Sequence, residues 1–253
     1  MGARRETVSV GSFLDLTIPL PPLDEQRRIV ARLDKVAAAI EARARAITEI
    51  ELEIKATLRC SFHKIIKAAP RARMNVVAPL VRRPIEIDPE VRYPELGVRS
   101  FGKGTFHKPE LSGLDVGTKR LFRIEKGDLL FNIVFAWEGA VAVVKAEDDG
   151  RVGSHRFLTC VPEPKLATAE FLRFFFLTDE GLQRLGEASP GGAGRNRTLG
   201  AQALEALEVP LPSLDDQKWF DALHAKATRV RASSSGAETE LGCLIPAMLN
   251  QEF

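Results

Sequence analysis

The chain has 253 residues, of which 45% are hydrophobic and 28% are charged, so it is long enough for one or two globular domains. Its formal net charge of +2 excludes a protein that coats nucleic acid through an overall basic field, but it still allows a local basic face. Three scattered cysteines favour a reducing compartment, and no apolar run approaches the length of a membrane span or a leader peptide, so we expect a soluble cytoplasmic protein with no membrane partner.

The beginning of the chain repeats as its end, at a fixed offset of 191 residues. The segment Arg4–Phe62 aligns without a gap to Arg195–Phe253, and residues 3–62 share 18 identities with their counterparts, several-fold more than chance gives for this composition. In each copy an apolar run ends in Pro-x-Pro, within Ile18–Arg27 (IPLPPLDEQR) and Val209–Lys218 (VPLPSLDDQK). The repeat predicts a unit of about 190 residues, of which the chain holds one whole copy and the tail of another.

A long helix is predicted after each proline pair, because proline neither continues a central strand nor lies comfortably inside a helix. The second helix follows Ser213, which fits an N-cap with Asp216 at N3, and Ser233–Gly236 and Pro246 are expected to fray or kink it locally. Heptad seams indicate that the two helices pack on each other, antiparallel if the ends of the intervening domain lie close together. The first helix is expected from about Leu23 to Lys67, with a seam at Leu33, Ile40, Ile47 and Ile54.

The segment between the helices, roughly Met74 to Pro212, is predicted to be a mixed α/β domain with a twisted sheet, so the fold class is α+β. Its apolar runs are short and are separated by Gly, Pro and Asp turns, which is typical of strands. Strands are expected at Gly97–Phe101, Leu121–Ile124, Asp128–Val134, Gly139–Val144 and Arg156–Val161, and helices at Ala167–Thr178 and Asp179–Ala188.

Catalytic signatures are largely missing, so we predict no catalytic residue, no cofactor and no metal. The glycine-rich stretch Ser189–Thr198 lacks the Gly-Lys-Ser/Thr of a phosphate-binding loop, and no Asn/Asp-Pro-Pro-aromatic run indicates amino-group methyl transfer. Cys60 and His63 have metal-ligand spacing, but no second pair completes four zinc ligands. A nuclease could use Asp88, Glu95 and Arg99, although the spacing is loose and no lysine completes the set.

Recognition chemistry is better represented. Arginine and lysine bind guanine or phosphate, asparagine binds adenine, and glutamate accepts from cytosine, and all these types lie in the loops of the predicted domain. The alternative interpretation is a set of solvated surface charges, since acids in the same domain nearly balance the bases. The candidate DNA-binding residues are Arg99, Ser100, Lys103, Thr105, His107, Lys108, Lys119, Arg120, Asn132, Trp137, Glu138, His155, Arg156, Arg195, Asn196 and Arg197.

With the duplicated PLPxLDxQ-plus-helix unit, the glycine loop before its second copy and GDLLFN at Gly127–Asn132, the chain resembles the DNA-specificity (S) subunit of Type I restriction–modification systems. The resemblance implies two target-recognition domains that alternate with two long antiparallel coiled-coil helices, each domain reading one half of a bipartite site. It also implies that methylation and ATP-driven cleavage belong to methyltransferase (M) and restriction (R) subunits, so this chain is expected not to be an enzyme.

On this resemblance, residues 1–17 correspond to a remnant of a preceding recognition domain. Residues 18–68 are expected to hold the first conserved region with its helix, 74–212 the recognition domain, and 213–253 the second conserved region with its helix. The expected partners are double-stranded DNA and the M and R subunits. The expected alternatives are a truncated gene product, a fragment whose start lies upstream, and a half-type subunit that self-association into a homodimer completes.

A rival hypothesis from another class is a coiled-coil adaptor whose globular domain binds protein without nucleic acid, and the near-neutral charge supports it. Salt dependence separates the two, because DNA binding weakens steeply as salt rises through counterion release. An independent nuclease or methyltransferase is the poorest fit to the sequence.

Overall fold

The computed structural model describes residues 10–15, 17, 20–192 and 197–252. The chain divides into two compact units, one formed by Met1–Ala56 with Ala227–Phe253 and the other by Thr57–Lys226. Two long helices, α2 (Leu23–Ile66) and α8 (Leu214–Glu252), contribute to both units, and a short helix, α1 (Val10–Leu14), lies in the first.

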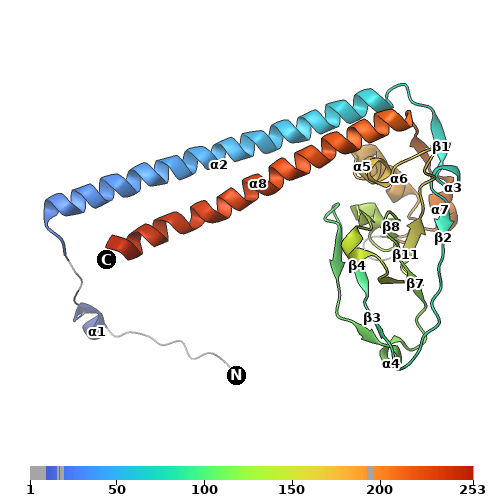
Figure 1. Cartoon of the computed structure of the whole chain (residues 1–253), viewed down its shortest axis with the longest axis horizontal. Helices are drawn as coiled ribbons and strands as arrows, with labels where there is room; N and C mark the ends of the chain where they lie inside the picture. Colours follow the sequence, from blue (N-terminus) through green and yellow to red (C-terminus); the bar gives the residue numbers. More distant parts are fainter. Residues whose placement is uncertain (1–9, 16, 18–19, 193–196, 253) are drawn as a thin grey trace. The chain divides into compact units, whose positions relative to one another are not determined.

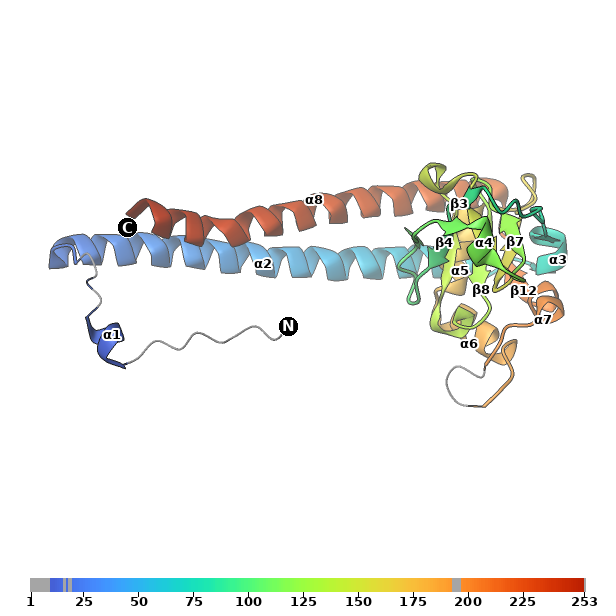
Figure 2. The ribbon, with the colours of Figure 1, turned by 90° about the horizontal axis from the view of Figure 1, so that it is seen from below.

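In the first unit, α2 and α8 run side by side and antiparallel (Figures 1 and 2). Arg231 Nε donates to Glu51 Oε2 across the pair at 3.0 Å. The four predicted seam residues of α2, Leu33, Ile40, Ile47 and Ile54, are all partly buried, whereas Leu52 is 63% exposed. The predicted antiparallel helix pair is therefore confirmed.

Helix α8 continues through Ser233–Gly236 and Pro246, so these residues do not end it, and the local fraying or kink expected there stays a prediction. Pro246 falls in the last two turns of α8 and lacks the N–H that would donate to the carbonyl four residues earlier. The start of α8 agrees with prediction. Ser213 Oγ accepts the Asp216 N–H at 3.1 Å and donates to its carboxylate at 2.6 Å.

The glutamine of the repeated motif makes the same local bond in both copies. Gln26 Nε2 donates to the Pro21 carbonyl at 2.7 Å, and Gln217 Nε2 donates to the Pro212 carbonyl at 3.0 Å. Gln217 is fully buried in the second unit, where it also donates to the Leu166 carbonyl at 2.9 Å and accepts the Thr168 N–H at 3.1 Å. The second copy therefore fixes the start of α8 to the segment that precedes α5 (Ala169–Phe176).

An aromatic cluster in the second unit joins the end of α2, α5 and the start of α8. The Phe220 ring lies 5.1 Å from that of Phe62 and 4.7 Å from that of Phe174, and Phe62 and Phe171 are 5.0 Å apart, all between ring centroids. Phe62 and Phe220 are buried. Aromatic pairs at these distances add stabilisation to the area that they bury, so this cluster anchors both long helices in the second unit.

Asp221, the next residue of α8, is a half-buried carboxyl whose ionised form is destabilised. Burial raises the pKa of this carboxyl to about 6, although a hydrogen bond from Thr168 lowers it, and its Oδ1 has no partner among the described residues. The folded-state pKa lies above the ordinary value, so ionisation destabilises the fold: the penalty is absent below pH about 4, grows as pH rises and is complete above pH about 6.

Replacing Asp221 with asparagine is therefore expected to stabilise the protein at pH 7 by about 1 kcal/mol, after allowance for the solvent screening of a half-buried group. Urea unfolding at pH 7 and pH 4 measures the effect, which should vanish at the lower pH. Asp215→Asn, at an exposed position in the first turn of the same helix, is the matched control and should not stabilise. An equal gain at both pH values would contradict the ionisation argument.

The second unit is built around an antiparallel four-stranded sheet with the order β2-β11-β8-β9. Its registers place Phe157 opposite Asn132, Leu130 opposite Ala142, and Thr159 opposite Val81. The sheet strands are β2 (Leu80–Val81), β8 (Leu129–Asn132), β9 (Val141–Val143) and β11 (Phe157–Cys160).

Smaller strand pairs and helices surround this sheet. The pairs are β1 with β12, β3 with β6, β4 with β5, and β7 with β10, all antiparallel. Their bounds are β1 (Arg71–Arg73), β3 (Arg92–Tyr93), β4 (Leu96–Val98), β5 (Thr105–His107), β6 (Leu111–Ser112), β7 (Leu121–Arg123), β10 (Val152–Ser154) and β12 (Glu208–Pro210). The remaining helices are α3 (Met74–Val77), α4 (Gly113–Val116), α6 (Asp179–Glu187) and α7 (Ala201–Ala206), with 3-10 turns η1 (Ala136–Glu138) and η2 (Ala146–Asp148).

The core of this unit lies between the sheet, the β4–β5 hairpin and α5. Leu96, Val98, Leu130 and Phe157 belong to one buried cluster, and Phe131 of β8 packs edge-on against Phe176 of α5 at 5.0 Å between centroids. The α+β class is confirmed, and a strand lies within or across each of the five predicted strand segments, always shorter than expected. The two helices predicted after them are present as α5 and α6.

Candidate nucleic-acid interface

Four loops of the second unit gather where β8 ends and β11 begins. The Ile133 N–H donates to the Arg156 carbonyl at 2.9 Å, and the Leu199 N–H donates to the Ile133 carbonyl at 2.8 Å. The Phe101 N–H, at the tip of the β4–β5 hairpin, donates to the Glu138 carbonyl at 2.8 Å. We call this region the loop edge; its described residues are 99–104, 133–139, 154–156, 189–192 and 197–199.

A hollow of about 570 Å³ opens beside the loop edge and is lined by Arg82, Pro84, Arg120, Phe122 and His155. The strand pairing explains this convergence. Ser154 of β10 lies opposite Leu121 of β7, which brings the β10–β11 turn close to Arg120. Arg82 directly follows the last residue of β2.

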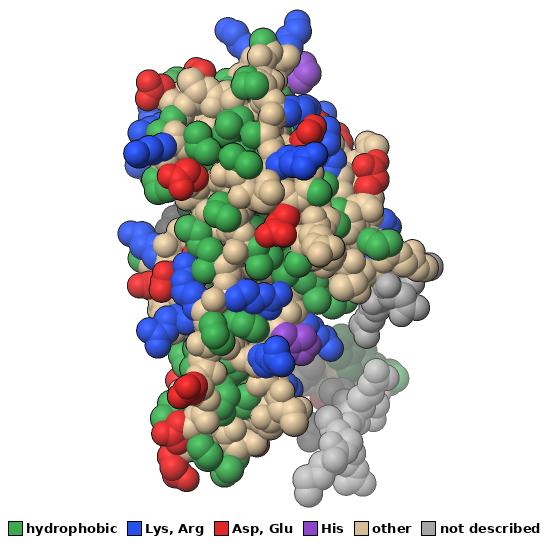
Figure 3. Space-filling view, turned by 90° about the vertical axis from the view of Figure 1, so that its right-hand side faces the viewer, with side chains coloured by type: hydrophobic (Ala, Val, Ile, Leu, Met, Phe, Trp, Pro, Cys, Tyr) green, Lys and Arg blue, Asp and Glu red, His purple; other side chains and the backbone are tan. Residues whose placement is uncertain are grey.

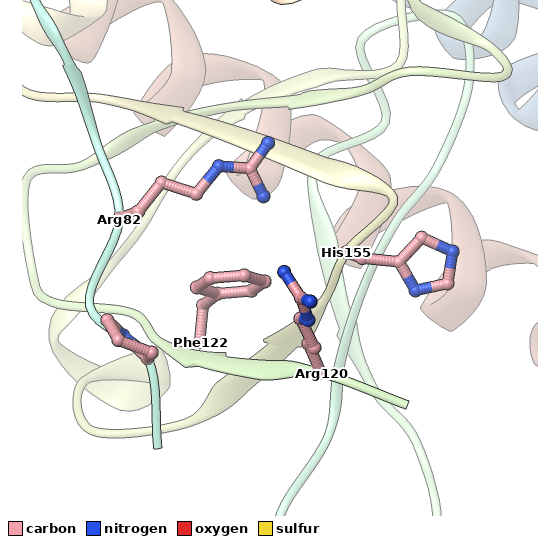
Figure 4. A pocket seen from close by; sticks show the side chains of 5 residues that line it. Arg82, Arg120, Phe122 and His155 are labelled. Atoms are coloured by element: carbon pink, nitrogen blue, oxygen red, sulfur yellow. The ribbon is translucent and has the colours of Figure 1, made fainter. Parts of the chain in front are cut away.

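The two arginines of the hollow lie near one aromatic ring. The Arg82 guanidinium carbon lies 4.9 Å from the centroid of the Phe122 ring, and Figure 4 shows the Arg82 and Arg120 guanidinium groups converging toward that ring. A guanidinium over an aromatic face is oriented without the loss of its hydrogen-bond donors. The planar groups therefore keep donors available to a ligand.

Among the described residues, the arginines of the hollow have no acidic partner. Some arginines of this unit are paired with acids: Arg83 donates to Asp128 at 2.7 Å, and Arg184 lies 2.9 Å from Glu180. Within residues 20–192 and 197–252, no carboxylate oxygen lies within 4.0 Å of a side-chain nitrogen of Arg82, Arg120 or His155. Figure 3 shows Lys and Arg side chains over much of one face, several of them near a histidine in its lower half, with acidic side chains between some of them. An exposed cationic hollow with aromatic and planar donors favours a phosphate or a nucleic-acid strand.

Comparisons with known proteins show what the chain is similar to. Residues 1–52 match the family model of the Type I restriction modification DNA specificity domain. The whole chain superposes on the HsdS subunit from Thermoanaerobacter tengcongensis with a TM-score of 0.61 and 18% identity. A structure from a study of complex assembly and conformational transition in the type I R-M system matches 92% of the chain, with a TM-score of 0.59 and 17% identity.

The resemblance to the Type I specificity subunit is confirmed. The chain covers 64% and 60% of those two solved chains, less than two thirds of either. At these identities the structural likeness shows a shared fold. No curated protein matches the sequence significantly.

Several of the predicted DNA-binding residues hold the loop edge together instead of facing outward. Ser100 Oγ donates to Glu138 Oε2 at 3.0 Å, and Trp137 Nε1 donates to the Val134 carbonyl at 3.0 Å. Arg197 Nη2 donates to the Gly186 carbonyl at 2.7 Å, and its guanidinium carbon lies 5.1 Å from the Trp137 ring centroid. These contacts fix the shape of the edge.

Two further predicted residues brace their own loops. Arg99 Nη1 donates to the Thr105 carbonyl at 2.8 Å and its guanidinium carbon lies 4.6 Å from the Phe106 ring centroid, so it clamps the β4–β5 hairpin. Asn132 Oδ1 accepts the Val134 N–H at 3.1 Å, which shapes the turn after β8.

Three predicted residues of β5 and its end are bound to acids of the fold. Thr105 Oγ1 donates to Asp148 Oδ2 at 2.8 Å, His107 Nε2 lies 2.9 Å from Asp148 Oδ1, and Lys108 Nζ donates to Glu95 at 2.7 Å. Asp148 is 1% exposed. These partners hold the hairpin, and they leave the polar atoms of Thr105 and His107 less available to a ligand.

Asp148 makes this hairpin sensitive to acid. Burial alone would raise the pKa of Asp148, but hydrogen bonds from Thr105, His107 and the Lys145 N–H lower it below its ordinary value. A carboxylate with a lowered folded-state pKa contributes stability that is present above its unfolded pKa of about 4 and is lost as pH falls through the folded value.

Replacing Asp148 with asparagine is expected to lower the free energy of unfolding at pH 7 by about 2 kcal/mol, because buried donors lose a charged acceptor. Urea unfolding between pH 7 and pH 3 measures it, and the variant should lose less stability on acidification than the unmodified chain. Glu147→Gln, an exposed acid in the same turn, is the control and should change little. An unaltered pH dependence in Asp148→Asn would contradict the assignment.

The remaining predicted residues are exposed at or next to the loop edge. They are Lys103, Lys119, Arg120, His155 and Arg156. Arg195 and Asn196 lie outside the described residues. Arg82 and Phe122 were not predicted; the only sequence signal was the basic pair Arg82–Arg83 directly after the apolar run that forms β2.

The rejected chemistries find no geometric support in the described part of the chain. No group of three or more His, Cys, Asp or Glu side chains there could hold a metal ion, and Cys60 is exposed. Of the loose nuclease set, Asp88 accepts the Glu90 N–H, Glu95 binds Lys108, and Arg99 donates to the Thr105 carbonyl. None of the described helices is long and apolar enough to span a membrane.

Proposed function

We propose that this chain is a non-catalytic, sequence-specific DNA-recognition subunit of a Type I restriction–modification complex. The observation that carries the proposal is the hollow in which the Arg82 and Arg120 guanidinium groups meet beside Phe122, without an acidic partner among the described residues. The match of residues 1–52 to a DNA specificity domain supports it. The recognition domain, residues 74–212, would read one half of a bipartite site.

In this proposal phosphate contacts and base contacts are divided between different residues. Arg82 and Arg120 would bind phosphate oxygens and fix the register of the duplex, together with the exposed Lys103, Lys119 and Arg156. Base edges would be read by groups of the loop edge that keep free donors or acceptors. The residues that would act chiefly by holding that edge in shape are Ser100, Asn132, Trp137, Glu138 and Arg197.

An adenine-methylation map of host DNA, with and without this gene, tests the function. A bipartite methylated motif should disappear on deletion and return when the gene is restored. Binding of the purified chain to duplex DNA should also weaken steeply with salt. A coiled-coil adaptor would leave the methylation map unchanged and show no salt-dependent DNA binding, and either result would refute the proposal.

The long helices would serve as a scaffold for the M and R subunits. Leu23, Val30 and Leu52 of α2 are 59%, 55% and 63% exposed, and Trp219 of α8 is 55% exposed. Exposed apolar side chains on a helix are suited to partner helices. Co-purification of an M subunit with the unmodified chain, and its loss in a variant with Leu23, Val30 and Leu52 replaced by serine, tests this role.

The repeated motif supports a homodimer, because its first copy is less covered than its second. Gln217 is buried and binds the segment before α5, whereas the equivalent Gln26 is only partly buried and makes its local bond to Pro21. Leu20 is 76% exposed, while its counterpart Leu211 is partly buried. In the proposed dimer a second copy of the chain would cover the first copy of the motif.

Sedimentation analysis of Leu20→Ser tests the dimer. The unmodified chain should sediment as a dimer, and Leu20→Ser should shift the equilibrium toward the monomer because it removes apolar area from the proposed contact. Val76→Ser is the matched control, since Val76 is 57% exposed on α3, away from the motif. A monomeric unmodified chain, or an equal shift in both variants, would count against the dimer.

A further inference from the structure

One exposed aromatic residue of the loop edge has no structural explanation. Phe101, at the tip of the β4–β5 hairpin, is 74% exposed. It is also the sole non-glycine residue with a positive φ in the described part of the chain, at 61°. Exposure alone would not indicate a function, since single apolar side chains are common on protein surfaces. A bulky side chain in the left-handed region is strained, and such strain concentrates at functional sites.

The surrounding contacts hold Phe101 in this conformation. Its N–H donates to the Glu138 carbonyl, and the next N–H, that of Gly102, donates to the Gly139 carbonyl at 2.9 Å. Ser100 Oγ binds the Glu138 carboxylate. A Cβ at Gly102 would lie 2.7 Å from Leu177, so the backbone is pressed against the end of α5. The tip is therefore fixed while the Phe101 ring is left out of the core.

The chemistry around the ring favours a nucleic acid over a protein partner. Lys103 Nζ lies 6.0 Å from the Phe101 ring centroid, which places a cation beside the exposed ring. Other strongly exposed apolar side chains of this unit lie elsewhere, at Val76, Leu114 and Trp219 on α3, α4 and α8. A protein-docking patch would need several apolar neighbours, whereas a single ring with a lysine suits a stacked base and its phosphate.

The tip and the cationic hollow lie at the same end of the four-stranded sheet. The hollow is beside β2, and the tip contacts the connection between β8 and β9. Adjacent strands are about 4.8 Å apart. The hollow beside β2 and the tip beside β9 are three strand spacings apart, which is roughly 15 Å. At about 3.4 Å per base pair this corresponds to about four base-pair steps of one duplex.

We infer that Phe101 is a wedge that unstacks one base step of the DNA, with Lys103 on the adjacent phosphate. This inference rests on the proposed DNA-recognition function. Insertion of a phenylalanine deforms the duplex, and flexible pyrimidine–purine steps deform at the lowest cost. Phe101 therefore contributes sequence preference at a step that no side chain reads by hydrogen bonding.

The test uses the full chain and duplexes selected by it from a random-sequence pool, with 2-aminopurine placed at successive positions. The unmodified chain should raise the fluorescence at one step, because an unstacked base is less quenched. Phe101→Ala should abolish that rise and weaken binding of the selected sequence roughly 10-fold. Binding to unrelated duplexes, which depends on phosphate contacts, should change little.

Two variants act as controls. Leu114→Ala removes an equally exposed apolar side chain, also 74% exposed, from α4 and should leave both signals unchanged. Phe101→Leu keeps an apolar wedge and should retain much of the fluorescence rise. If Leu114→Ala also lost the fluorescence rise, the rise would not report on the hairpin tip. That result would overturn the inference.

Other outcomes separate the wedge from the proposed function. DNA binding that weakens in Arg82→Gln but shows no unstacked step, or an unchanged rise in Phe101→Ala, overturns the wedge and leaves DNA recognition standing. If Phe101→Ala binds DNA normally but no longer co-purifies with an M subunit, the tip is a protein contact and the wedge is wrong. If the unmodified chain binds no duplex under any salt condition, both proposals fail.

Discussion

Replacing Phe220 with alanine is expected to lower the free energy of unfolding by about 4 kcal/mol, the largest stability effect that we predict. Phe220 is fully buried and its ring lies within 5.1 Å of both Phe62 and Phe174, measured between centroids. Truncation removes the buried ring and leaves a cavity among residues of three helices that cannot all move inward. Urea unfolding followed by circular dichroism measures the loss as a lower midpoint with an unchanged slope.

The neighbouring residue provides a matched control. Trp219 on the same helix turn is 55% exposed, so Trp219→Ala should change the free energy of unfolding by less than about 0.5 kcal/mol. Phe220→Leu keeps most of the apolar volume and should cost less than about 1.5 kcal/mol. A loss in Phe220→Ala no larger than that in Trp219→Ala would show that the cluster does not hold the helices.

The sequence predicted the parts of the fold that depend on local periodicity. The seam of Leu33, Ile40, Ile47 and Ile54 repeats every seven residues, and helix α2 indeed runs from Leu23 to Ile66. Runs such as Leu129–Asn132 are apolar enough to be recognised as strands on their own. By contrast β1 was missed, because Arg71–Arg73 is a strand only through its pairing with Glu208–Pro210, far away in the sequence.

The site was harder to predict because residue type does not reveal the partner. His107 and Thr105 have the chemistry of DNA contacts, but both bind Asp148, which is more than forty positions away. Arg82 and Phe122 are forty positions apart and meet only because β2 and β7 lie close together, at the bridge between Pro84 and Phe122. Neither pairing leaves a local signal.

One physical cause separates the charged residues that became structural from those that remain available to a ligand. Charged residues near an acid in the fold are neutralised and become structural, as Arg83 does with Asp128. Arg82 and Arg120 have no acidic partner among the described residues and meet beside Phe122, so their combined charge is available to a ligand. A near-neutral net charge is therefore compatible with a local cationic site, since the balance is decided by which charges meet.

Replacing both Arg82 and Arg120 with glutamine is expected to weaken binding to duplex DNA roughly 100-fold. A hydrogen bond to a charged group contributes about 1.5 kcal/mol, or about tenfold in affinity, and the double variant loses two such contacts. If both residues bind phosphates, all sequences should weaken alike, and the slope of log affinity against log salt should fall by about two. Fluorescence anisotropy across a salt series measures both quantities.

Arg123→Gln is the matched control for that double variant. It removes a positive charge from β7 itself, but successive strand residues point to opposite faces, so its side chain leaves β7 away from Phe122. Its effect should stay below about threefold, less than the loss of one charged hydrogen bond. An equal loss of affinity in Arg123→Gln would mean that binding depends on the overall charge of the unit. Unchanged affinity in the double variant would show that the hollow does not contact DNA.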